Sequence, residues 1–358
     1  MSLGEIKLNQ IIKNPMQLAL QLAEKGKYSV SPNPMVGAIL IKNNKLIGYG
    51  YHLYQGDYHA ESKAIDMAGI NAKESSLYLN LEPCYHYGLT SPCVDKIIRS
   101  EIKEVHLSEI DPNPLVAGKS LEKLKNAGIK VYIGDHKQEA IELNEIFYHF
   151  MKYKRPFVIA KWAMTIDGKI ATKNDSKWIS CNESRDHVQD LRNSVDAILI
   201  GANTAKIDNP SLNVRKKDFA KERQPHKFIL GKNLDSLSKD SNLFKYNPDK
   251  THLINTDNNF DLIKLLEKMG EMGITSLLVE GGSFTLSKFL EKNLINKFYC
   301  YIAPKFIAGN DSISPFNQDI GINFIKDAKN VRFKDNRFIG NDILIEGKFR
   351  NQECLQEL

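Results

Sequence analysis

A chain of 358 residues is longer than one ordinary domain and predicts two, each large enough to bury a core of its own. Hydrophobic residues make up 42% of the chain and charged residues 26%, which excludes a mostly disordered or a collagen-like protein. The net charge of +6 suits an anionic or phosphorylated substrate, but it is too diffuse to indicate a nucleic-acid-binding protein.

The five cysteines are an odd number in a long chain, which excludes a secreted disulfide framework. Only Cys84 and Cys93 are close in sequence, and this points to metal binding rather than to a disulfide. The amino terminus lacks the apolar run of a signal peptide, and the longest apolar stretches are strand-sized. We therefore expect a reducing, cytoplasmic setting.

Strand and helix patterns alternate in the first half, which predicts a sheet covered by helices. Strands are predicted at residues 35–41, 46–52, 76–81, 104–109 and 130–133, and helices at 15–26, 59–69, 92–100, 119–126 and 138–152. A basic segment that ends at Pro156 follows the last helix. We place the domain boundary near it, with one domain over residues 1–150 and a second over residues 151–358.

A second alternating series follows this boundary. Strands are predicted at residues 157–163, 197–201, 228–230, 252–255, 276–279, 297–302 and 342–349, and helices at 182–193, 260–272 and 283–291. The polar stretch 235–250 has no clear period and is predicted as loop. A Gly-x-Gly-x-x-Gly fingerprint is absent, and its nearest substitute, residues 280–283, is by itself more often an ordinary tight turn than a phosphate-binding one.

Three side chains form a candidate zinc site in the first half. His59 begins a helix, Cys84 closes a strand and Cys93 begins another helix. One imidazole and two thiolates suit zinc, and three protein ligands leave the fourth tetrahedral position for water, as in catalytic sites. Zinc lowers the pKa of such a water towards roughly 7. Glu61, two residues after His59, is placed to shuttle its proton without binding the metal.

Each of these residues alone has a common structural explanation, because a single His or a pair of thiols is usually just packed in a core. The ordered combination His-x-Glu, Pro-Cys, Pro-Cys is far more specific, and it is the signature of zinc nucleobase deaminases. The spacing differs from that signature, because eight residues separate Cys84 and Cys93 where two are usual.

The long cysteine loop, residues 81–93, resembles that of the riboflavin-biosynthesis deaminases, which also carries His and Gly. Residues 32–37 and 111–118 resemble the substrate-binding loops of that family. The resemblance implies substrate contacts from Asn33, His86, Asp111 and Asn113. Without it, turn chemistry would be the better explanation for Asn33, Asp111 and Asn113.

The cysteine loop departs from the family pattern at two positions. Leu89 stands where Lys or Arg is usual, and Ser91 replaces a usual proline. The missing cation leaves the zinc chemistry intact but puts the anchoring of the first substrate in doubt, with His86 as the candidate to compensate.

The second half resembles the riboflavin-specific reductases, which have a dihydrofolate-reductase-like fold and use NADPH. The matching segments follow in family order at residues 165–169, 176–179, 201–204, 208–215, 279–282 and 303–305. The resemblance thus runs from about Pro15 to Phe349, and the fused halves are typical of bifunctional riboflavin-biosynthesis enzymes. It implies an α/β chain with an N-terminal cytidine-deaminase-like three-layer domain and a C-terminal dihydrofolate-reductase-like domain.

The reductase resemblance also implies roles for ten residues. The cofactor would be contacted by Ala163, Trp178, Thr204, Asp208 and Gly282. The substrate would be contacted by Ser176, Arg192, Leu212, Arg215 and Glu280. The two arginines can fork onto a phosphate. Trp178 could lie against a flat ring, although core packing explains a tryptophan equally well.

We expect zinc-dependent deamination of 2,5-diamino-6-ribosylamino-4(3H)-pyrimidinone 5′-phosphate in the first domain. In the second, NADPH would reduce the ribosyl group of the product, 5-amino-6-(5-phosphoribosylamino)uracil, to ribityl. Both partners are small molecules, with no nucleic acid or membrane, and the family resemblance implies a homo-oligomer. One alternative is a deaminase of nucleic acid with an accessory domain. The other is a non-catalytic protein with structural zinc, for which His86 is the nearest fourth ligand.

Overall fold

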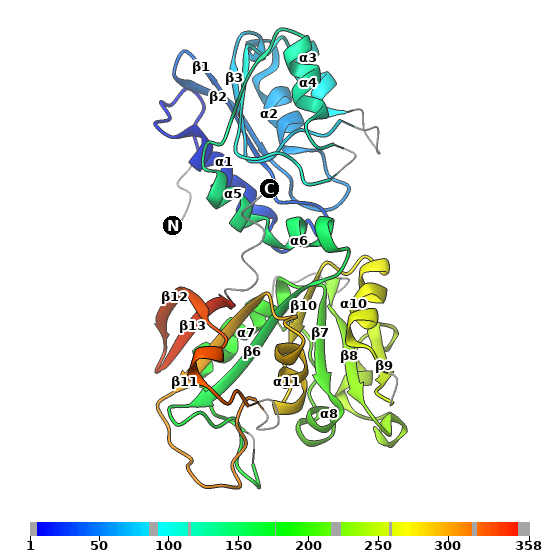
Figure 1. Cartoon of the computed structure of the whole chain (residues 1–358). Coiled ribbons are helices and arrows are strands. Elements are labelled where there is room, and N and C mark those ends of the chain that lie inside the picture. Colours follow the sequence, from blue (N-terminus) through cyan, green and yellow to red (C-terminus); the bar gives the residue numbers. More distant parts are fainter. Residues whose placement is uncertain are drawn as a thin grey trace. The chain divides into compact units, whose positions relative to one another are not determined.

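The fold is taken from a computed structural model that describes residues 6–85, 92–113, 116–175, 177–215, 223–257, 260–316 and 321–349. The chain divides into two compact units, Met1–Lys154 and Arg155–Leu358. Each unit is built on one sheet with helices packed against it (Figure 1).

The sheet of the first unit has five strands in the order β2-β1-β3-β4-β5. Their bounds are β1 Gly37–Lys42, β2 Lys45–Tyr51, β3 Ser76–Leu79, β4 Glu104–Leu107 and β5 Lys130–Ile133. β1 runs antiparallel to β2 and β3, whereas β3, β4 and β5 are parallel. The helices are α1 Pro15–Ala23, α2 Ala60–Ala68, α3 Cys93–Arg99, α4 Lys119–Asn126, α5 Lys137–Leu143 and α6 Glu145–Tyr153.

Alternation along β1 explains why helices cover both faces of this sheet. Ala38 and Leu40 pack with α2, α3 and α4 in one core. Ile39 and Ile41 point to the other face, where they pack against Met16 and its neighbours on α1. Successive strand side chains point to opposite faces, so an apolar run such as β1 must be buried on both sides. The result is a three-layer helix–sheet–helix arrangement.

The helix predicted over residues 138–152 is divided at Asn144 into α5 and α6. The Asn144 side chain accepts a hydrogen bond from the backbone N–H of Met35 at 2.8 Å and donates one to its carbonyl at 2.9 Å. Asn144 is only 2% exposed, so these bonds satisfy an amide that burial would otherwise leave unpaired. The Asn144 side chain, at the break between the two helices, therefore holds the loop that precedes β1.

The sheet of the second unit has eight strands in the order β12-β13-β11-β6-β10-β7-β8-β9. Their bounds are β6 Phe157–Thr165, β7 Ala197–Gly201, β8 His226–Gly231, β9 Thr251–Asn255, β10 Ser276–Val279, β11 Lys297–Ala303, β12 Val331–Ile339 and β13 Asp342–Phe349. The strands from β11 to β9 are parallel, and β13 and β12 complete one end as an antiparallel hairpin.

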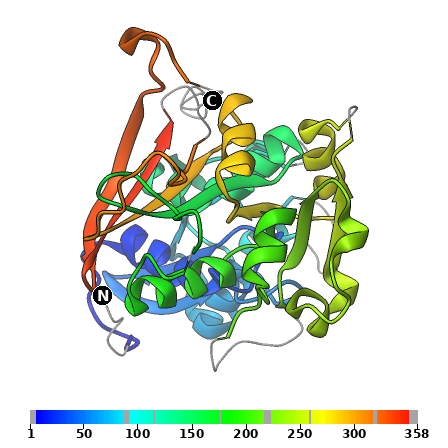
Figure 2. The same cartoon turned by 90° about the horizontal axis from the view of Figure 1, so that it is seen from below.

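The helices of this unit are α7 Asn182–Asn193, α8 Ala202–Asp208, α9 Asn242–Lys245, α10 Leu262–Glu271 and α11 Ser283–Glu291. Apolar side chains of α10 and α11, including Met269 and Phe289, form one core with the strands. The connection through α7 crosses the sheet in the opposite direction to those through α10 and α11. Right-handed crossovers therefore put α7 on the opposite face (Figure 2). Short 3₁₀ turns lie at Glu24–Gly26, Gly69–Ala72, Leu234–Ser236, Pro248–Lys250 and Ile325–Asp327.

Three elements of the second unit were not predicted from the sequence pattern. The stretch predicted as loop over 235–250 contains the short helix α9, and α8 follows β7 directly. The edge strand β12 has mostly exposed side chains, several of them charged, so it lacks the apolar run that marks a strand. Its pairing with β13, rather than burial, makes it a strand.

In the part of the chain that the structure describes, no helix combines the length and the apolar character needed to cross a membrane.

Candidate metal centre and active-site cleft

The three predicted zinc ligands converge in the first unit. His59 is the N-cap of α2, Cys93 is the first residue of α3, and Cys84 lies in the segment after β3. His59 Nδ1 lies 3.1 Å from Cys93 Sγ and 3.5 Å from Cys84 Sγ, and all three ligand atoms lie within 4.8 Å of one another. Ligand atoms of a tetrahedral zinc lie roughly 3.5 Å apart. The donor set and its spacing therefore fit zinc.

Hydrogen bonds within this cluster lower the pKa of Cys84 and raise that of Cys93, so Cys84 is the thiolate of the pair. A hydrogen bond from the Cys93 thiol, followed by one from His59, lowers the pKa of Cys84 to about 4. The hydrogen bond to Cys84 and burial raise the pKa of the Cys93 thiol. The hydrogen bond to Cys84 raises the pKa of His59 to about 9. Thiolate and imidazole are the forms that bind zinc, and a divalent cation at this point would take the place of the shared protons.

Glu61 adds a buried carboxyl group beside the three ligands. Its side chain is 3% exposed, and Oε2 has no hydrogen-bond partner among the described residues. Burial raises the pKa of Glu61, partly offset by the positive charge of His59. An unpaired buried carboxyl oxygen costs free energy, and a ligand or a reaction that uses the oxygen explains why the fold keeps it. This is the observation that supports a proton-transfer role for Glu61.

We expect one zinc ion per chain, held by His59, Cys84 and Cys93. Metal analysis of Cys84→Ala and Cys93→Ala should find little zinc, because each loses a thiolate ligand. Cys181→Ala, which changes a cysteine of the second unit, should keep wild-type zinc. Zinc-free native protein, or equal zinc in all three variants, would contradict the assignment.

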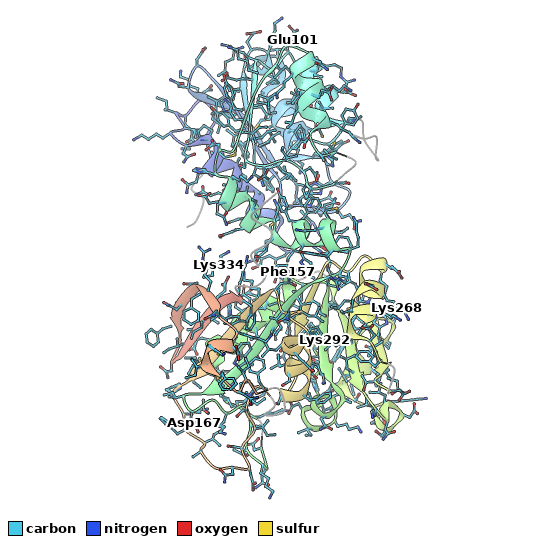
Figure 3. The ribbon with its side chains drawn as sticks, in the orientation of Figure 1. Glu101, Phe157, Asp167, Lys268, Lys292 and Lys334 are labelled. Atoms are coloured by element: carbon cyan, nitrogen blue, oxygen red, sulfur yellow. The ribbon has the colours of Figure 1, made fainter. Side chains whose placement is uncertain are left out.

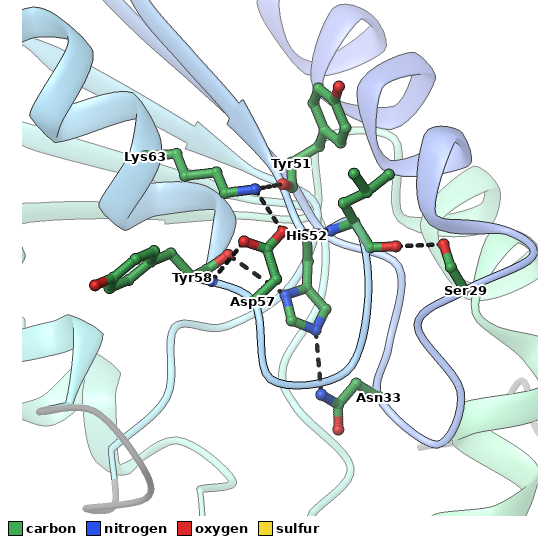
Figure 4. A network of polar contacts seen from close by, with 8 residues as sticks. Ser29, Asn33, Tyr51, His52, Asp57, Tyr58 and Lys63 are labelled. Carbon is green, nitrogen blue, oxygen red and sulfur yellow. Dashed lines mark hydrogen bonds and ion pairs between the residues drawn. The ribbon is translucent and has the colours of Figure 1, made fainter. Parts of the chain in front are cut away.

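The structure adds His52, which the sequence pattern did not identify. Its ring lies edge-on to that of His59, with centroids 5.6 Å apart. The Asn33 side-chain amide lies 3.1 Å from His52 Nε2, and the Tyr58 carbonyl lies 3.4 Å from Nδ1 (Figure 4). Burial lowers the pKa of His52, so the ring is neutral and can accept from Asn33 while it donates to Tyr58. His52 thereby links the Asn33 side chain to the ring of His59.

The loop before His59 is closed by Asp57. Its carboxylate accepts hydrogen bonds from the backbone N–H groups of Leu53 and Tyr58 at 3.1 and 2.8 Å (Figure 4). It also pairs with Lys63 Nζ at 2.5 Å, which donates in addition to the Tyr51 carbonyl at 3.1 Å. These bonds fix the approach of the chain to the first ligand.

Asp111 and Asn113 lie in a second loop that Glu82 holds. Glu82 is 4% exposed and accepts hydrogen bonds from the backbone N–H groups of Asp111, Gly118 and Ser120 and from the Ser120 hydroxyl, at 2.6–3.2 Å. Burial, with smaller effects of the Glu82 and Cys84 charges, raises the pKa of Asp111 to about 6. Glu82 precedes Pro83 and Cys84, so it ties this loop to the metal ligands. Nothing in the sequence indicates that Glu82 holds this loop, except that it lies two residues before Cys84.

Two predicted site residues lie outside the described residues. They are His86, in the cysteine loop with Leu89 and Ser91, and Ser176, in the second unit.

The second unit contains a cleft of about 2160 Å³ at the carboxyl ends of its parallel strands. Its lining brings together nine of the ten residues assigned to the reductase: Ala163, Trp178, Arg192, Thr204, Asp208, Leu212, Arg215, Glu280 and Gly282. Leu212 is buried with a φ of 54°, a rare conformation for a side chain of this size. Such strain is typical of residues that a binding site holds in place.

A buried charge cluster lies at the floor of this cleft. The Arg192 guanidinium forms a fork onto Glu280, with Nε donating at 2.6 Å and Nη2 at 3.0 Å. Lys161 Nζ lies 4.0 Å from the same carboxylate. The predicted phosphate fork of Arg192 is thus directed at Glu280, which leaves its remaining N–H groups for a ligand. The sequence pattern predicts Lys161, in the middle of β6, only as part of a strand.

The adjacent strands β7 and β10 form a topological switch point at the cleft, because the chain leaves β7 towards β8 and leaves β10 in the opposite direction, towards β11. Dinucleotides bind at such switch points, where glycines let the backbone approach phosphate. A Cβ on Gly201 would lie 2.9 Å from Thr285 Oγ1, and one on Gly281 would lie 2.5 Å from Thr285 Cβ. Both glycines therefore pack against Thr285 of α11 with little room for a side chain, which is compatible with a dinucleotide cradle.

Trp178 is exposed at the side of the cleft, with the Arg185 guanidinium 4.7 Å from its ring centroid. One face of the indole is thus stacked on a cation. Core packing, the alternative explanation for this tryptophan, does not apply, because 63% of its surface is exposed.

Asp167 connects two loops at the end of this unit (Figure 3). Its carboxylate accepts hydrogen bonds from the backbone N–H groups of Ile307 at 3.3 Å and Ala308 at 2.7 Å. The segment 165–169 is therefore bound to the segment after β11, which also matched the reductase pattern.

Two family models match the chain, one in each unit. The model described as the cytidine and deoxycytidylate deaminase zinc-binding region matches residues 10–109. The model of the RibD C-terminal domain matches residues 156–345. The first contains the whole metal centre, and the second contains every cleft residue discussed above.

Similar proteins span nearly the whole chain. Riboflavin biosynthesis protein RibD of Aquifex aeolicus is 40% identical over 94% of this chain and 98% of its own. The Escherichia coli protein of the same name is 32% identical, over 92% and 97%. A solved structure from Thermotoga maritima has a TM-score of 0.84 and 34% identity over 94% of this chain and 97% of its own. It is described as a diaminohydroxyphosphoribosylaminopyrimidine deaminase/5-amino-6-(5-phosphoribosylamino)uracil reductase.

Proposed function

The chain belongs to the RibD family of bifunctional riboflavin-biosynthesis deaminase/reductases, and from this we propose the substrates, the cofactor and the roles of individual residues. The first unit hydrolyses the amino group of 2,5-diamino-6-ribosylamino-4(3H)-pyrimidinone 5′-phosphate. The second reduces the ribosyl group of 5-amino-6-(5-phosphoribosylamino)uracil to ribityl with NADPH. A homo-oligomer, also implied by the family resemblance, stays a prediction that light scattering can test.

For the deaminase, zinc bound by His59, Cys84 and Cys93 would supply the Lewis acidity that makes water a nucleophile near neutral pH. Glu61 takes up the proton that water loses and passes it on so that the amino group leaves as ammonia. Its buried, unpaired Oε2 supports this role. Asn33, oriented by His52, and Asp111 with Asn113 offer amide and carboxyl groups to the pyrimidine and its sugar.

For the reductase, a nicotinamide cofactor supplies the hydride. The residues of the cleft bind both ligands and exclude water. Opening of the sugar ring leaves its oxygen in need of a proton, and Lys161 is the candidate donor. Burial lowers the pKa of Lys161, partly offset by the charge of Glu280, and this favours release of a proton from the ammonium. Arg215 and the N–H groups of Arg192 that do not bond to Glu280 are suited to the substrate phosphate.

The observation that carries the deaminase assignment is the His59–Cys84–Cys93 cluster with Glu61 beside it. The test supplies the diaminopyrimidine phosphate with and without NADPH and identifies the products by mass. We expect the deaminated pyrimidine phosphate without NADPH and its ribityl form with NADPH. Ammonia release from a polynucleotide, but not from the pyrimidine phosphate, would overturn the proposal.

Arg215→Ala should weaken binding of the reductase substrate more than binding of the cofactor, because a charged contact to phosphate is lost. Loss of one partner of such a pair costs about 2–5 kcal/mol when the pair is buried, and the exposed position of Arg215 places the effect at the lower end. Steady-state kinetics should show a raised KM for the ribosyl substrate. An unchanged substrate KM with a raised cofactor KM would reassign Arg215 to the cofactor.

A further inference from the structure

The segment 209–215 lines the cleft between residues assigned to both ligands of the reductase, yet it contains no helix or strand. Asp208, directly before it, is assigned to the cofactor, whereas Leu212 and Arg215 are assigned to the substrate. Asn209 and Leu212 have positive φ values of 42° and 54°. Because this backbone belongs to no helix or sheet ladder, side chains from other segments must hold it in place.

The amino end of the segment is held by α9, the short helix in the stretch that the sequence pattern predicted as loop. The backbone N–H of Asn242 donates to Asn209 Oδ1 at 2.8 Å, and Asn242 Nδ2 donates to the Asn209 carbonyl at 2.9 Å. Both bonds reach the residue that directly follows Asp208. Lys177 Nζ also donates to the Asp208 carbonyl at 2.8 Å, but the Lys177 side chain is exposed and comes from a loop. Asn242 is therefore the contact that ties this end to a helix.

The carboxyl end of the segment is held by Gln224, two residues before β8 begins. Gln224 Oε1 accepts from the Val214 N–H at 2.9 Å, and Gln224 Nε2 donates to the Val214 carbonyl at 3.0 Å. The next N–H, that of Arg215, donates to Gln189 Oε1 on α7 at 3.1 Å. Gln224 itself lies outside the lining of the cleft. It can therefore influence the ligands only through the segment that it holds.

Two lysines fix these two contacts to the sheet. Lys227 of β8 is fully buried, and its Nζ donates to the carbonyls of Leu243 and Tyr246, in and directly after α9, at 3.1 and 2.7 Å. Burial lowers the pKa of Lys227 to about 8, so the ammonium is still the main form at neutral pH. Lys250 Nζ donates to the Gln224 carbonyl at 3.0 Å. Both holding residues are thus in place before any ligand binds.

We propose that Asn242 and Gln224 are positioning residues of the reductase, with Asn242 placing the cofactor end of the segment 209–215 and Gln224 its substrate end. The inference rests on the proposed reductase function and gives a role in it to α9 and to the chain before β8. Neither residue supplies the hydride or a proton. Loss of either contact should therefore weaken the binding of one ligand and leave the chemical step unchanged.

Steady-state kinetics of the full-length protein test this. Asn242→Ala removes one exposed hydrogen bond and should raise the KM for NADPH about threefold. Gln224→Ala removes two partly buried bonds and should raise the KM for the ribosyl substrate about tenfold. In both variants the other KM and kcat should stay near the wild-type values. Lys245→Ala, which changes an exposed lysine of the same helix α9, is the control and should alter neither KM.

Gln224→Glu keeps the acceptor for the Val214 N–H and loses only the donor, so it should raise the substrate KM by less than Gln224→Ala does. It also serves if Gln224→Ala does not fold. Unchanged KM values in Asn242→Ala and Gln224→Glu would overturn the proposal. A fall in kcat with unchanged KM values would do the same, because it indicates a smaller folded fraction rather than displaced ligand contacts. A rise of the same KM in both variants would overturn the division into two ends. Failure of the proposed reductase function would appear differently, as no ribityl product from the wild type.

Discussion

Replacement of Glu61 by glutamine should lower the deaminase rate by roughly 10²–10⁴-fold while zinc stays bound. Glutamine keeps the size of the side chain and most of its hydrogen bonding, but it cannot accept a proton at neutral pH. Glu61 is nearly fully buried beside the metal ligands and is not one of the three clustered donors, so its loss removes proton transfer rather than metal binding.

The measurement combines ammonia release with zinc analysis of the same preparation. Glu122→Gln, which changes an exposed glutamate on α4, is the matched control and should keep both properties. The reductase assayed with deaminated substrate should be near normal in Glu61→Gln, because all of the assigned reductase residues belong to the second unit. Loss of both activities in a folded, zinc-loaded variant would mean that the two assignments describe one site.

Replacement of Glu280 by alanine should destabilise the second unit by about 3–5 kcal/mol and abolish the reductase. The substitution leaves Arg192, and with it Lys161, as buried cations without their carboxylate partner. Burial alone would raise the pKa of Glu280, but the charge and hydrogen bonds of Arg192, together with the charge of Lys161, lower it overall. The ionised form of Glu280 is therefore favoured over the protonated form more strongly in the folded chain than in the unfolded chain.

The sign of the pH dependence follows from this lowered pKa. The stabilisation by Glu280 is present above its unfolded pKa of about 4.3 and is lost as the pH falls through the lower folded value. The difference in unfolding free energy between wild type and Glu280→Ala should accordingly be largest near neutral pH and shrink in acid.

Denaturant unfolding followed by tryptophan fluorescence can measure this effect selectively, because Trp162 and Trp178 are the only tryptophans and both lie in the second unit. Glu291→Ala is the matched control. It removes an exposed ion pair with Lys288, whose two side chains are 48% and 49% exposed, and it should cost less than about 1 kcal/mol. Equal stability losses in the two variants would show that the cluster around Glu280 contributes no more than a surface pair.

The metal centre was predictable because its information is local. His59 and Glu61 are two residues apart at the start of one helix, and Cys84 and Cys93 each follow a proline, with Cys93 at the start of a helix. Zinc accepts few donor sets, so residue type and order already restrict the chemistry. The same holds for most strands and helices, whose apolar period of two or of about 3.6 depends only on which face is buried.

The partners of these residues were not predictable, because they come together only through sheet order. His52 meets Asn33, and Glu82 reaches Ser120, across segments with no sequence period in common. Lys161 looks like any residue of a buried strand in the sequence, but β10 pairs with β6 and places Glu280, the residue after β10, beside it. Hydrogen bonds and ion pairs act over a few ångströms, so a sequence can name a charged residue but not its partner.

The sequence by itself determined the two-domain α/β organisation, the candidate zinc ligands and the family pattern, because periodicity and motif order carry this information along the chain. The tertiary structure added the direction of the Arg192 fork and the cleft at the switch point between β7 and β10. The edge strand β12 belongs to the same group, since its pairing with β13 stabilises it in the absence of an apolar run. Each of these features depends on contacts between segments that only the folded chain brings within reach of one another.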